Sequence, residues 1–316
     1  MKSKKTKKTF LSRFWGLGII ALFIIVSKTE IGQNELKNIL TEVIHLETAT
    51  IVSKDRVERA PDVTLEGKEL RVHFIDVGQA DSIFIELPNN QTMLIDAGET
   101  GNGPEVVSYI NDAGYSTLDY VVATHPHADQ IGGMATIIEQ LKINKFFMPK
   151  KEQTTNIFEK MIDALTNKSV DVYTAKSGVV ILEEGALRIE IVAPTSDTYS
   201  DLNNYSAVLK LSYGENSFLF TGDAEVNSEE QISLDVEADV LKVGHHGSDS
   251  STSTDFLRRV NPKYAVISVG EGNKFDHPSP SVIAKLEQAG VETFRTDLLG
   301  TIVFRSDGQN ITILDE

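Results

Sequence analysis

Residues Ala123–Gly133 contain two histidines and an aspartate at alternate positions, His125, His127 and Asp129. Imidazole nitrogens and carboxylate oxygens are the usual protein ligands of zinc and similar cations. The chain has seven histidines in 316 residues and no cysteine, so a metal must be bound by histidine and carboxylate rather than by thiolate. The spacing therefore predicts a metal-binding loop. The alternative, a polar turn that contains two histidines by chance, is disfavoured in a chain so poor in histidine.

Two later segments offer ligands of the same kind. Asp223 follows the apolar residues 218–220, and His245 and His246 follow the predicted strand 240–243. Neighbouring side chains of an extended chain point in opposite directions, so we expect only one of these two histidines to face a metal. A glycine–aspartate pair after a strand is by itself typical of a turn, but three such loops together predict one site. Its nitrogen and oxygen ligands suit Zn²⁺, with Mn²⁺ or iron as alternatives.

The elements around the first loop explain how it could be positioned. Residues 118–122 form a short apolar run that predicts a buried strand before the histidines. Pro126 prevents the chain from continuing as a helix or a central strand. Gly132 and Gly133 are expected to let the backbone turn into a helix at 134–141.

From about residue 69 the chain alternates between predicted strands and helices. The expected strands are 70–77, 82–87, 92–96, 118–122, 145–148, 179–182, 187–192, 207–211, 217–220, 240–243, 265–269 and 302–304, and the expected helices are 104–113, 134–141, 156–166, 225–233, 253–260 and 281–289. Two groups of strands with helices between and after them predict an α/β (α+β) fold of two sheets face to face, with helices on both outer faces.

The first 28 residues are a basic leader followed by an apolar run. Residues 1–28 hold seven Lys and Arg and no acidic residue, and residues 14–26 are apolar throughout. This pattern is typical of an export signal, although the run is shorter than the roughly 20 residues of a transmembrane helix. A cleaved signal peptide and an uncleaved membrane anchor both stay open, and either predicts a body that is secreted or anchored outside the cytoplasm. Residues 29–68 are expected to be a spacer and 69–316 one folded domain.

The charge of the body limits its partners. The net charge is −16, and outside the leader 23 basic residues stand against 46 acidic ones. Such a body repels nucleic acid at long range, which argues against tight non-specific binding. A nuclease whose metal ions bind the phosphate locally remains compatible with this charge.

Several motifs together resemble a known family. They are Phe74–Ser82, Leu94–Gly98, the loop with His125, His127 and Asp129, then Asn203–Ser206, Thr221–Asp223, Gly244–Ser248 and His277–Pro278. These segments are similar to the metallo-β-lactamase superfamily, and most of all to the soluble domain of ComEC-type DNA-uptake proteins. The resemblance covers about residues 69–314 and implies an αββα sandwich of mixed sheets that usually binds two bridged zinc ions. The sequence has no multi-span channel region, so we expect the chain not to be a full transporter.

The resemblance also implies a ligand set. By this match His125 and His127 bind the first metal, Asp129 and His245 bind the second, and Asp223 bridges both. His245 is preferred to His246 because the family's last ligand directly follows a strand–glycine step. His246 and Gln130 are then possible ligands or supports of the ligands.

The chain departs from the family pattern at Gln130, where the pattern has a histidine. A neutral amide oxygen is a much weaker zinc ligand than imidazole. The family's third motif usually supplies another histidine, but here it offers Asn203, Asn204 and Ser206. We therefore expect one or two metal ions, the second weakly bound or exchangeable.

The mechanism that follows is metal-assisted hydrolysis. A bound metal lowers the pKa of water from 15.7 to about 7, and the resulting hydroxide attacks an acyl or phosphoryl centre. Asp129 is expected to orient this nucleophile, and the backbone amides near Gly247 and Ser248 to stabilise the developing charge. His277 is a candidate to protonate the leaving group or hold a phosphate, and an ordinary loop histidine is the alternative.

Asn204, Ser206, Gly247 and Ser248 are the candidate substrate-binding residues. Ser248 opens a hydroxyl-rich loop, 248–252, before a predicted helix. Phosphate binding at the helix start and simple helix capping both explain this composition.

Three functional interpretations remain. The first is a phosphodiesterase or nuclease outside the cytoplasm, favoured by the ComEC-like motifs. The second is a hydrolase of small esters, lactones or lactams, favoured by the acidic body, since fold does not determine substrate. The third is a non-catalytic relative, because Gln130 is compatible with loss of activity. The expected partners are a phosphodiester or another small hydrolysable substrate, with nucleic acid among the candidates, and a membrane for the N-terminus. No protein partner is indicated.

Overall fold

The computed structural model describes residues 65 and 68–314. The chain divides into two units, Met1–Pro61 and Asp62–Glu316, and all described residues belong to the second. The predicted leader at 1–28 lies outside the described residues, as does the spacer at 29–68 apart from Leu65 and Lys68. Within the described part of the chain, no helix is both long and apolar enough to cross a membrane.

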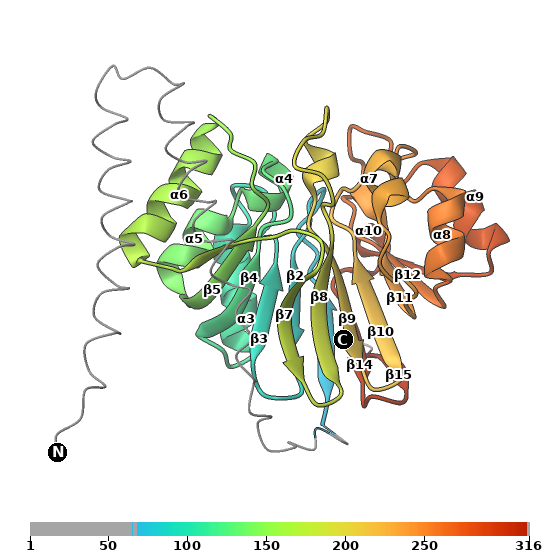
Figure 1. Cartoon of the computed structure of the whole chain (residues 1–316), viewed down its shortest axis with the longest axis horizontal. Coiled ribbons are helices and arrows are strands. Elements are labelled where there is room, and N and C mark those ends of the chain that lie inside the picture. Colours follow the sequence, from blue (N-terminus) through green and yellow to red (C-terminus); the bar gives the residue numbers. More distant parts are fainter. Residues whose placement is uncertain (1–64, 66–67, 315–316) are drawn as a thin grey trace, which may run out of the picture. The chain divides into compact units, whose positions relative to one another are not determined.

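The first sheet has eight strands in the order β15-β14-β1-β2-β3-β4-β5-β6 (Figure 1). Its strands are β1 (Leu70–Phe74), β2 (Ile83–Glu86), β3 (Thr92–Ile95), β4 (Thr117–Val122), β5 (Lys142–Met148), β6 (Val172–Thr174), β14 (Ile302–Ser306) and β15 (Ile311–Leu314). Strands β3 to β6 are parallel to one another, whereas β1, β2, β14 and β15 pair antiparallel. The sheet is therefore mixed.

The second sheet has seven strands in the order β13-β12-β11-β10-β9-β8-β7. Its strands are β7 (Val179–Glu184), β8 (Leu187–Ala193), β9 (Val208–Tyr213), β10 (Asn216–Phe220), β11 (Val240–Lys242), β12 (Tyr264–Ile267) and β13 (Glu292–Arg295). Strands β10 to β13 are parallel, and β7 to β10 are antiparallel. This half thus repeats the mixed architecture of the first.

Three apolar clusters define four layers. The faces of the two sheets meet in one cluster, which contains Phe74, Phe218, Phe220 and Phe304. A second cluster joins the first sheet to α3 (Gly103–Asp112), α5 (Met134–Gln140) and α6 (Asn156–Lys168). A third joins the second sheet to α8 (Thr254–Val260) and α9 (Pro280–Gln288), with α7 (Val226–Gln231) alongside. The αββα sandwich expected from the sequence is confirmed.

The strands that were not expected all lie at sheet edges. β6, β13 and β15 are each the terminal strand of a sheet. Edge strands are half solvated, so they lack the periodic burial that identifies a strand in sequence, and all three residues of β6 are exposed. Two one-turn helices, α4 (Ala128–Ile131) and α10 (Thr296–Leu299), were not expected either, because they are too short to show a helical period.

Gly132 and Gly133 are required for a different reason from the one expected. Their φ angles of −58° and −82° are ordinary helical values, so no special turn is made. A Cβ atom on Gly133 would lie 2.2 Å from the carbonyl oxygen of Ala97, and one on Gly132 would lie 2.3 Å from the backbone nitrogen of Thr100. Glycine is needed because the backbone after β3 passes so close, and this contact holds α4 against the first sheet.

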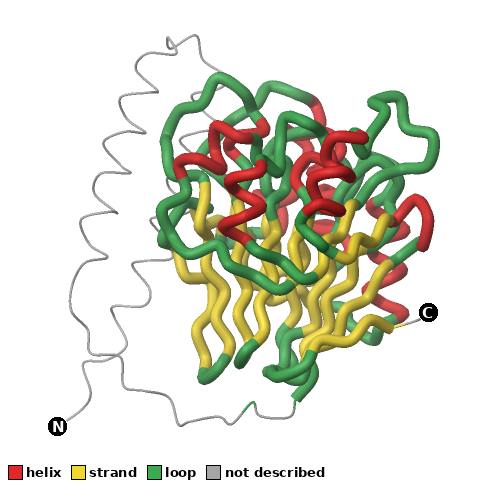
Figure 2. The backbone as a smooth tube through the Cα atoms, turned by 90° about the vertical axis from the view of Figure 1, so that its right-hand side faces the viewer, coloured by secondary structure: helices red, strands yellow, loops and turns green. Residues whose placement is uncertain are grey.

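The loops that carry the candidate ligands leave the same end of both sheets. Figure 2 shows the strands running into one edge where loops and short helices gather. Two backbone hydrogen bonds join loops at this edge, one between the two sheets and one within the second sheet. Ala207 N donates to Thr124 O (2.9 Å), and His245 N donates to Gly222 O (3.1 Å), which joins the second and third ligand loops.

Candidate metal centre

Asp223 lies at the centre of the histidine cluster. It follows β10, and its side chain is 1% exposed. Its Oδ2 atom is 3.7 Å from His125 Nε2, 3.6 Å from His246 Nε2 and 3.9 Å from His245 Nε2. Residues far apart in the sequence thus meet around one buried carboxylate, as the three-loop prediction requires.

The first loop brings two imidazoles together. His125 Nε2 is 3.0 Å from His127 Nδ1, and the far nitrogen of His125 is 3.2 Å from the hydroxyls of Thr124 and Ser206. Burial and the neighbouring His127 lower the pKa of His125 to about 3, so its ring is neutral at physiological pH. Neutral imidazole is the form that binds a metal.

His246 is held from its far side. Its Nδ1 atom is 3.0 Å from the carbonyl oxygen of Ser268 and 3.4 Å from Asp81 Oδ1. When Nδ1 donates to that carbonyl, Nε2 keeps its lone pair and faces Asp129 Oδ2 (3.4 Å) and Asp223. A histidine fixed in this way by a carbonyl and a carboxylate is the usual arrangement around protein-bound metals.

Asp81 completes the cluster and was not identified from the sequence. It lies between β1 and β2, where we expected only a turn, and one of its carboxylate oxygens lies within 4.8 Å of a carboxylate oxygen of Asp223 and a ring nitrogen of His246. Asp81 Oδ2 is 3.0 Å from the buried Lys242 Nζ, whereas Oδ1 is buried with no hydrogen-bond partner among the described residues. The available sequence signal was a carboxylate inside an apolar stretch, within a segment already noted for its resemblance to the superfamily.

The adjacent histidines do not alternate as expected. His245 and His246 have φ angles of +50° and +54°, so the backbone is left-handed rather than extended. Both imidazoles can therefore approach Asp223 instead of pointing apart. The preference for His245 stays a prediction. His245 is the more exposed ring, and its Nδ1 is 3.3 Å from Ser250 Oγ and 3.6 Å from Glu225 Oε1.

The cluster holds more negative charge than its own groups balance. Burial, together with Asp81 and Asp129, raises the pKa of Asp223 to about 7. Burial alone would lower the pKa of His246, but Asp223 and Asp81 raise it well above its usual value. Both shifts have one cause, carboxylates crowded in a medium that solvates them poorly. A bound cation relieves this crowding.

Gln130 supplies a further observation that fits a cation. Its side chain is buried, with Nε2 3.3 Å from His246 Nε2 and 3.5 Å from Asp223 Oδ1. Its carbonyl oxygen Oε1 has no hydrogen-bond partner among the described residues. An unpaired buried carbonyl is costly unless something positive meets it. The imidazoles, carboxylates and this oxygen together suit a divalent metal such as zinc, manganese or iron.

Three of the candidate substrate-binding residues already make hydrogen bonds within the protein. Ser206 Oγ accepts from Asp223 N (3.1 Å) besides contacting His125, so it holds two candidate ligands. Asn204 donates to Glu225 Oε2 (3.1 Å) and accepts from Ser228 N (3.0 Å), so both ends of its amide are already bonded. Ser248 N donates to His245 O (2.8 Å), which engages one of the amides expected to stabilise charge.

Gly247 and His277 border the third loop. A Cβ atom on Gly247 would lie 2.6 Å from Pro278 Cβ, and Gly247 O accepts from Ser279 N (2.8 Å). The His277 ring packs edge-on against His245, with centroids 5.6 Å apart. Burial and the nearby His245 lower the pKa of His277.

Comparison with known proteins agrees with this geometry. Residues 75–271 match the model of the metallo-beta-lactamase superfamily, so the chain belongs to that superfamily, whose members are generally metal-dependent hydrolases. The described fold is similar to the metallo-beta-lactamase fold protein YhfI from Bacillus subtilis, with a TM-score of 0.52 and 11% identity over 75% of this chain and 100% of that one.

Two competence proteins are among its relatives. ComE operon protein 3 of Bacillus subtilis is 32% identical over 265 residues, which cover 78% of this chain and 34% of that protein. Competence protein ComA of Neisseria gonorrhoeae is 27% identical over 244 residues, 75% of this chain and 32% of that one. The chain therefore spans about a third of the length of these relatives.

Proposed function

We propose that this chain is a metal-dependent phosphodiesterase that acts on nucleic acid outside the cytoplasm. The buried cluster of Asp81, Asp223 and His246 carries the metal-dependent part of the proposal. Similarity to competence proteins supports nucleic acid as the substrate. The basic leader and apolar run of residues 1–28 support export, either as a secreted protein or as one anchored to the membrane.

The cluster residues divide the catalytic tasks. A divalent cation bound here supplies a water of lowered pKa and a positive charge for the phosphoryl oxygens. Asp223 would hold such a cation together with His125, His127 and His246, since Asp223 Oδ2 lies 3.7 Å from His125 Nε2 and 3.6 Å from His246 Nε2, and His125 Nε2 lies 3.0 Å from His127 Nδ1. Asp129, whose side chain is 27% exposed, is accessible to solvent and can accept the proton of the attacking water.

His277 suits substrate holding better than acid catalysis. Its lowered pKa means that the ring is mainly neutral at pH 7, so it donates a hydrogen bond rather than a full proton. Its Nδ1 atom is buried without a hydrogen-bond partner among the described residues.

The experiment is a substrate panel on the purified full-length chain with added Zn²⁺ or Mn²⁺. We expect hydrolysis of bis(p-nitrophenyl) phosphate and of DNA, and a loss of at least about 100-fold in His127→Ala, since metal ligands are essential in such sites. Equal hydrolysis by this variant would show that the activity comes from elsewhere. Failure of the wild type on every phosphodiester, with metal bound, would reject the proposal.

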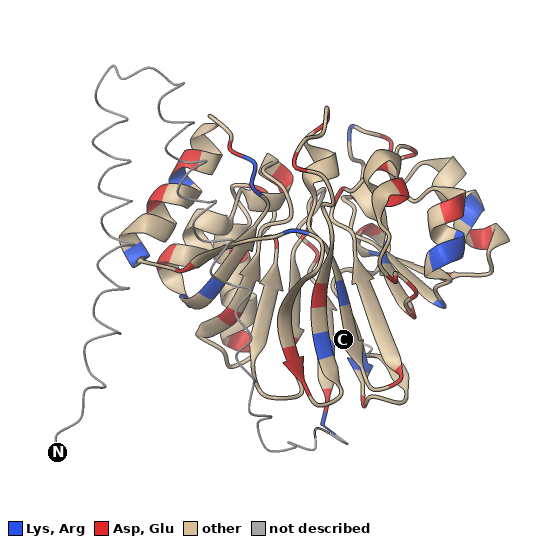
Figure 3. Ribbon diagram, viewed as in Figure 1, with Lys and Arg blue, Asp and Glu red and all other residues tan. Residues whose placement is uncertain are grey.

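A hydrolase of small neutral substrates is the second candidate. The acidic body favours it, because outside residues 1–28 there are 23 basic residues and 46 acidic ones, and Figure 3 shows Lys and Arg interspersed with Asp and Glu in that view. Faster cleavage of a chromogenic lactam or lactone than of any phosphodiester would select this function. Less than one tightly bound metal per chain, with no hydrolysis at all, would indicate a non-catalytic protein.

A further inference from the structure

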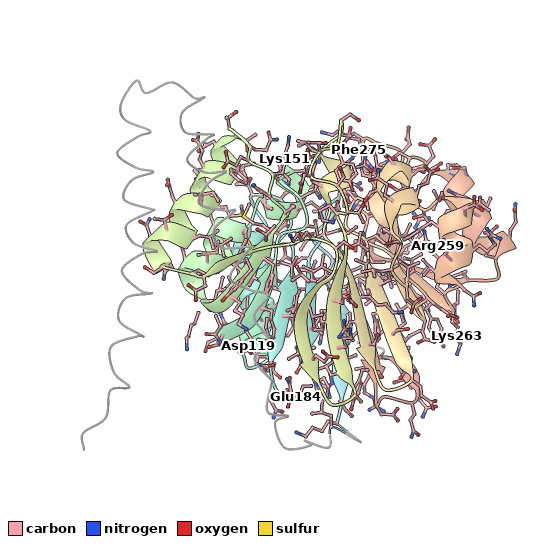
Figure 4. The ribbon with its side chains drawn as sticks, viewed as in Figure 1. Asp119, Lys151, Glu184, Arg259, Lys263 and Phe275 are labelled. Atoms are coloured by element: carbon pink, nitrogen blue, oxygen red, sulfur yellow. The ribbon has the colours of Figure 1, made fainter. Side chains whose placement is uncertain are left out.

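An exposed aromatic ring lies beside the candidate metal centre. Phe275 is on the loop between β12 and α9, and 53% of its surface is exposed. The other exposed large hydrophobic residues among the described ones are on the edge strands β6 and β7 or on α10: Val172, Tyr173, Val180, Leu298 and Leu299. Phe275 and Lys151 lie at the loop end of the strands in Figure 4, opposite Asp119 and Glu184.

A sequence of ring contacts leads from Phe275 to the cluster. Phe275 stacks on His277, with centroids 5.8 Å apart and planes 27° from parallel. His277 meets His245 edge-on at 5.6 Å, and His245 Nε2 is 3.9 Å from Asp223 Oδ2. The exposed ring is thus two contacts away from the candidate ligands, on the side of His277.

The loop is held in one conformation by Asn273. The side-chain oxygen of this residue accepts from the backbone nitrogens of Phe275 and His277 (both 3.1 Å), and its nitrogen donates to the carbonyls of Gly270 (3.0 Å) and His277 (2.6 Å). Gly270 N in turn donates to Gln79 Oε1 at 3.1 Å. An exposed ring on an ordered loop loses little entropy when it binds a partner.

The charges near the ring favour stacking over phosphate binding. Lys274 Nζ lies 4.9 Å from the centroid of Phe275, and it is exposed. The carboxylates of Asp276 and Asp249 are near His277 and add negative charge to this region. The loop is therefore not a cluster of cations that would bind a backbone phosphate. What it offers is a largely exposed aromatic ring with one exposed cation over it, the features on which nucleobases stack.

We propose that Phe275 is a base-stacking residue, which binds the face of an unpaired nucleobase next to the phosphodiester that is cleaved. The proposal rests on the proposed function and refines its substrate class. Within a duplex both faces of an internal base are covered by its neighbours, so the base on Phe275 must come from a single strand or a frayed end. Phe275 thereby selects phosphodiesters that carry a nucleobase over phosphodiesters that do not.

The test compares two substrates with the same leaving group. Thymidine 5′-(p-nitrophenyl phosphate) carries a base, and methyl p-nitrophenyl phosphate does not. Stacking is worth about 1–3 kcal/mol per base, so Phe275→Leu should raise KM for the thymidine ester about 5- to 150-fold more than for the methyl ester. Phe275→Trp should keep the wild-type ratio of the two KM values. The control Tyr173→Leu, which removes a ring that is 42% exposed on β6, should leave that ratio unchanged.

A binding measurement separates this inference from the proposed function. Single-stranded DNA that contains 2-aminopurine is titrated with the full-length chain in Ca²⁺, and its fluorescence is expected to be quenched by wild type and Phe275→Trp but not by Phe275→Leu. Equal quenching by all three proteins, or equal KM changes on both esters, would overturn the stacking role. Absence of hydrolysis with normal quenching would reject the phosphodiesterase and retain the base site.

Discussion

Lys242 and Asp81 form an ion pair between the two sheets, with Lys242 Nζ 3.0 Å from Asp81 Oδ2 and side-chain exposures of 0% and 2%. Lys242 ends β11, and Asp81 precedes β2. Burial raises the pKa of Asp81, but Lys242 and His246 outweigh it and lower this pKa to about 2. The other oxygen of Asp81 is 3.4 Å from His246 Nδ1. A buried lysine therefore keeps ionised the carboxylate that orients a candidate metal ligand.

Asp81→Asn should separate the contribution of Asp81 to metal affinity from its contribution to stability. We expect Zn²⁺ or Mn²⁺ affinity to fall about 10- to 100-fold, as for other groups that orient metal-bound histidines. The free energy of unfolding of the metal-free protein should fall by about 3–5 kcal/mol, because Lys242 loses its counter-charge. Urea unfolding and metal titration measure the two effects. Asp81→Asn with Lys242→Met should recover stability but not affinity, and recovery of both would contradict the orienting role.

Gln130→His should strengthen binding of a second metal. An imidazole is a better zinc ligand than an amide oxygen, so we expect at least about tenfold tighter binding of the weaker ion. Isothermal titration with Zn²⁺ measures this, and Gln130→Leu is the matched control that removes the unpaired oxygen. Unchanged stoichiometry and affinity in both variants would place Gln130 outside the metal centre.

Asp96→Asn should change how stability depends on pH. Asp96 is buried after β3 and accepts hydrogen bonds from Thr124 N (2.8 Å) and Thr124 Oγ1 (2.7 Å). Burial outweighs these bonds and raises the pKa of Asp96 well above 3.8. Between the unfolded and folded pKa values the folded state binds more protons, so wild-type stability falls as the pH rises through that interval.

Asparagine does not titrate and avoids this loss. In metal-free protein the stability of Asp96→Asn relative to wild type should therefore increase as the pH rises above 3.8. Urea unfolding at pH 4 and pH 8 gives the comparison. A difference that does not vary with pH would mean that the pKa of Asp96 is the same in the folded and unfolded states.

Gly133→Ala should destabilise the protein by about 1–3 kcal/mol, as expected for an atom forced into a packed site. The added Cβ would meet the Ala97 carbonyl at 2.2 Å, and the strain should shift the loop that carries the candidate ligands. Thermal unfolding measures the loss. Gly101→Ala is the control for glycine replacement, since a Cβ there has nothing within 4 Å and its φ lies outside the left-handed region. Equal losses in the two variants would argue against the close contact as the cause.

The sequence was sufficient for the layers and for most of the strand ends. A central strand such as β12 is apolar along its length because both faces are covered, and this makes it recognisable. The edge strands β6, β13 and β15 have no such pattern, since solvent reaches them. The apolar pattern of a sequence thus reflects burial, and it does not identify strands that are exposed to solvent.

The candidate site was only partly predictable for a similar reason. His125, His127 and Asp129 are close in sequence, so their spacing alone suggests a common purpose. Asp81 was missed because its partners, Lys242 and His246, are distant in the chain, and only folding brings them together. Local sequence also does not reveal the left-handed backbone that turns both adjacent histidines toward Asp223.

The most direct test is a crystal structure of the protein grown with Mn²⁺ or Zn²⁺, with anomalous diffraction recorded at the metal edge. We predict an anomalous peak about 2.0–2.2 Å from Asp223 and from at least one imidazole nitrogen of His125 or His246. A metal-loaded crystal with no peak at Asp223, or with a peak only at a distant surface position, would contradict the proposed metal centre.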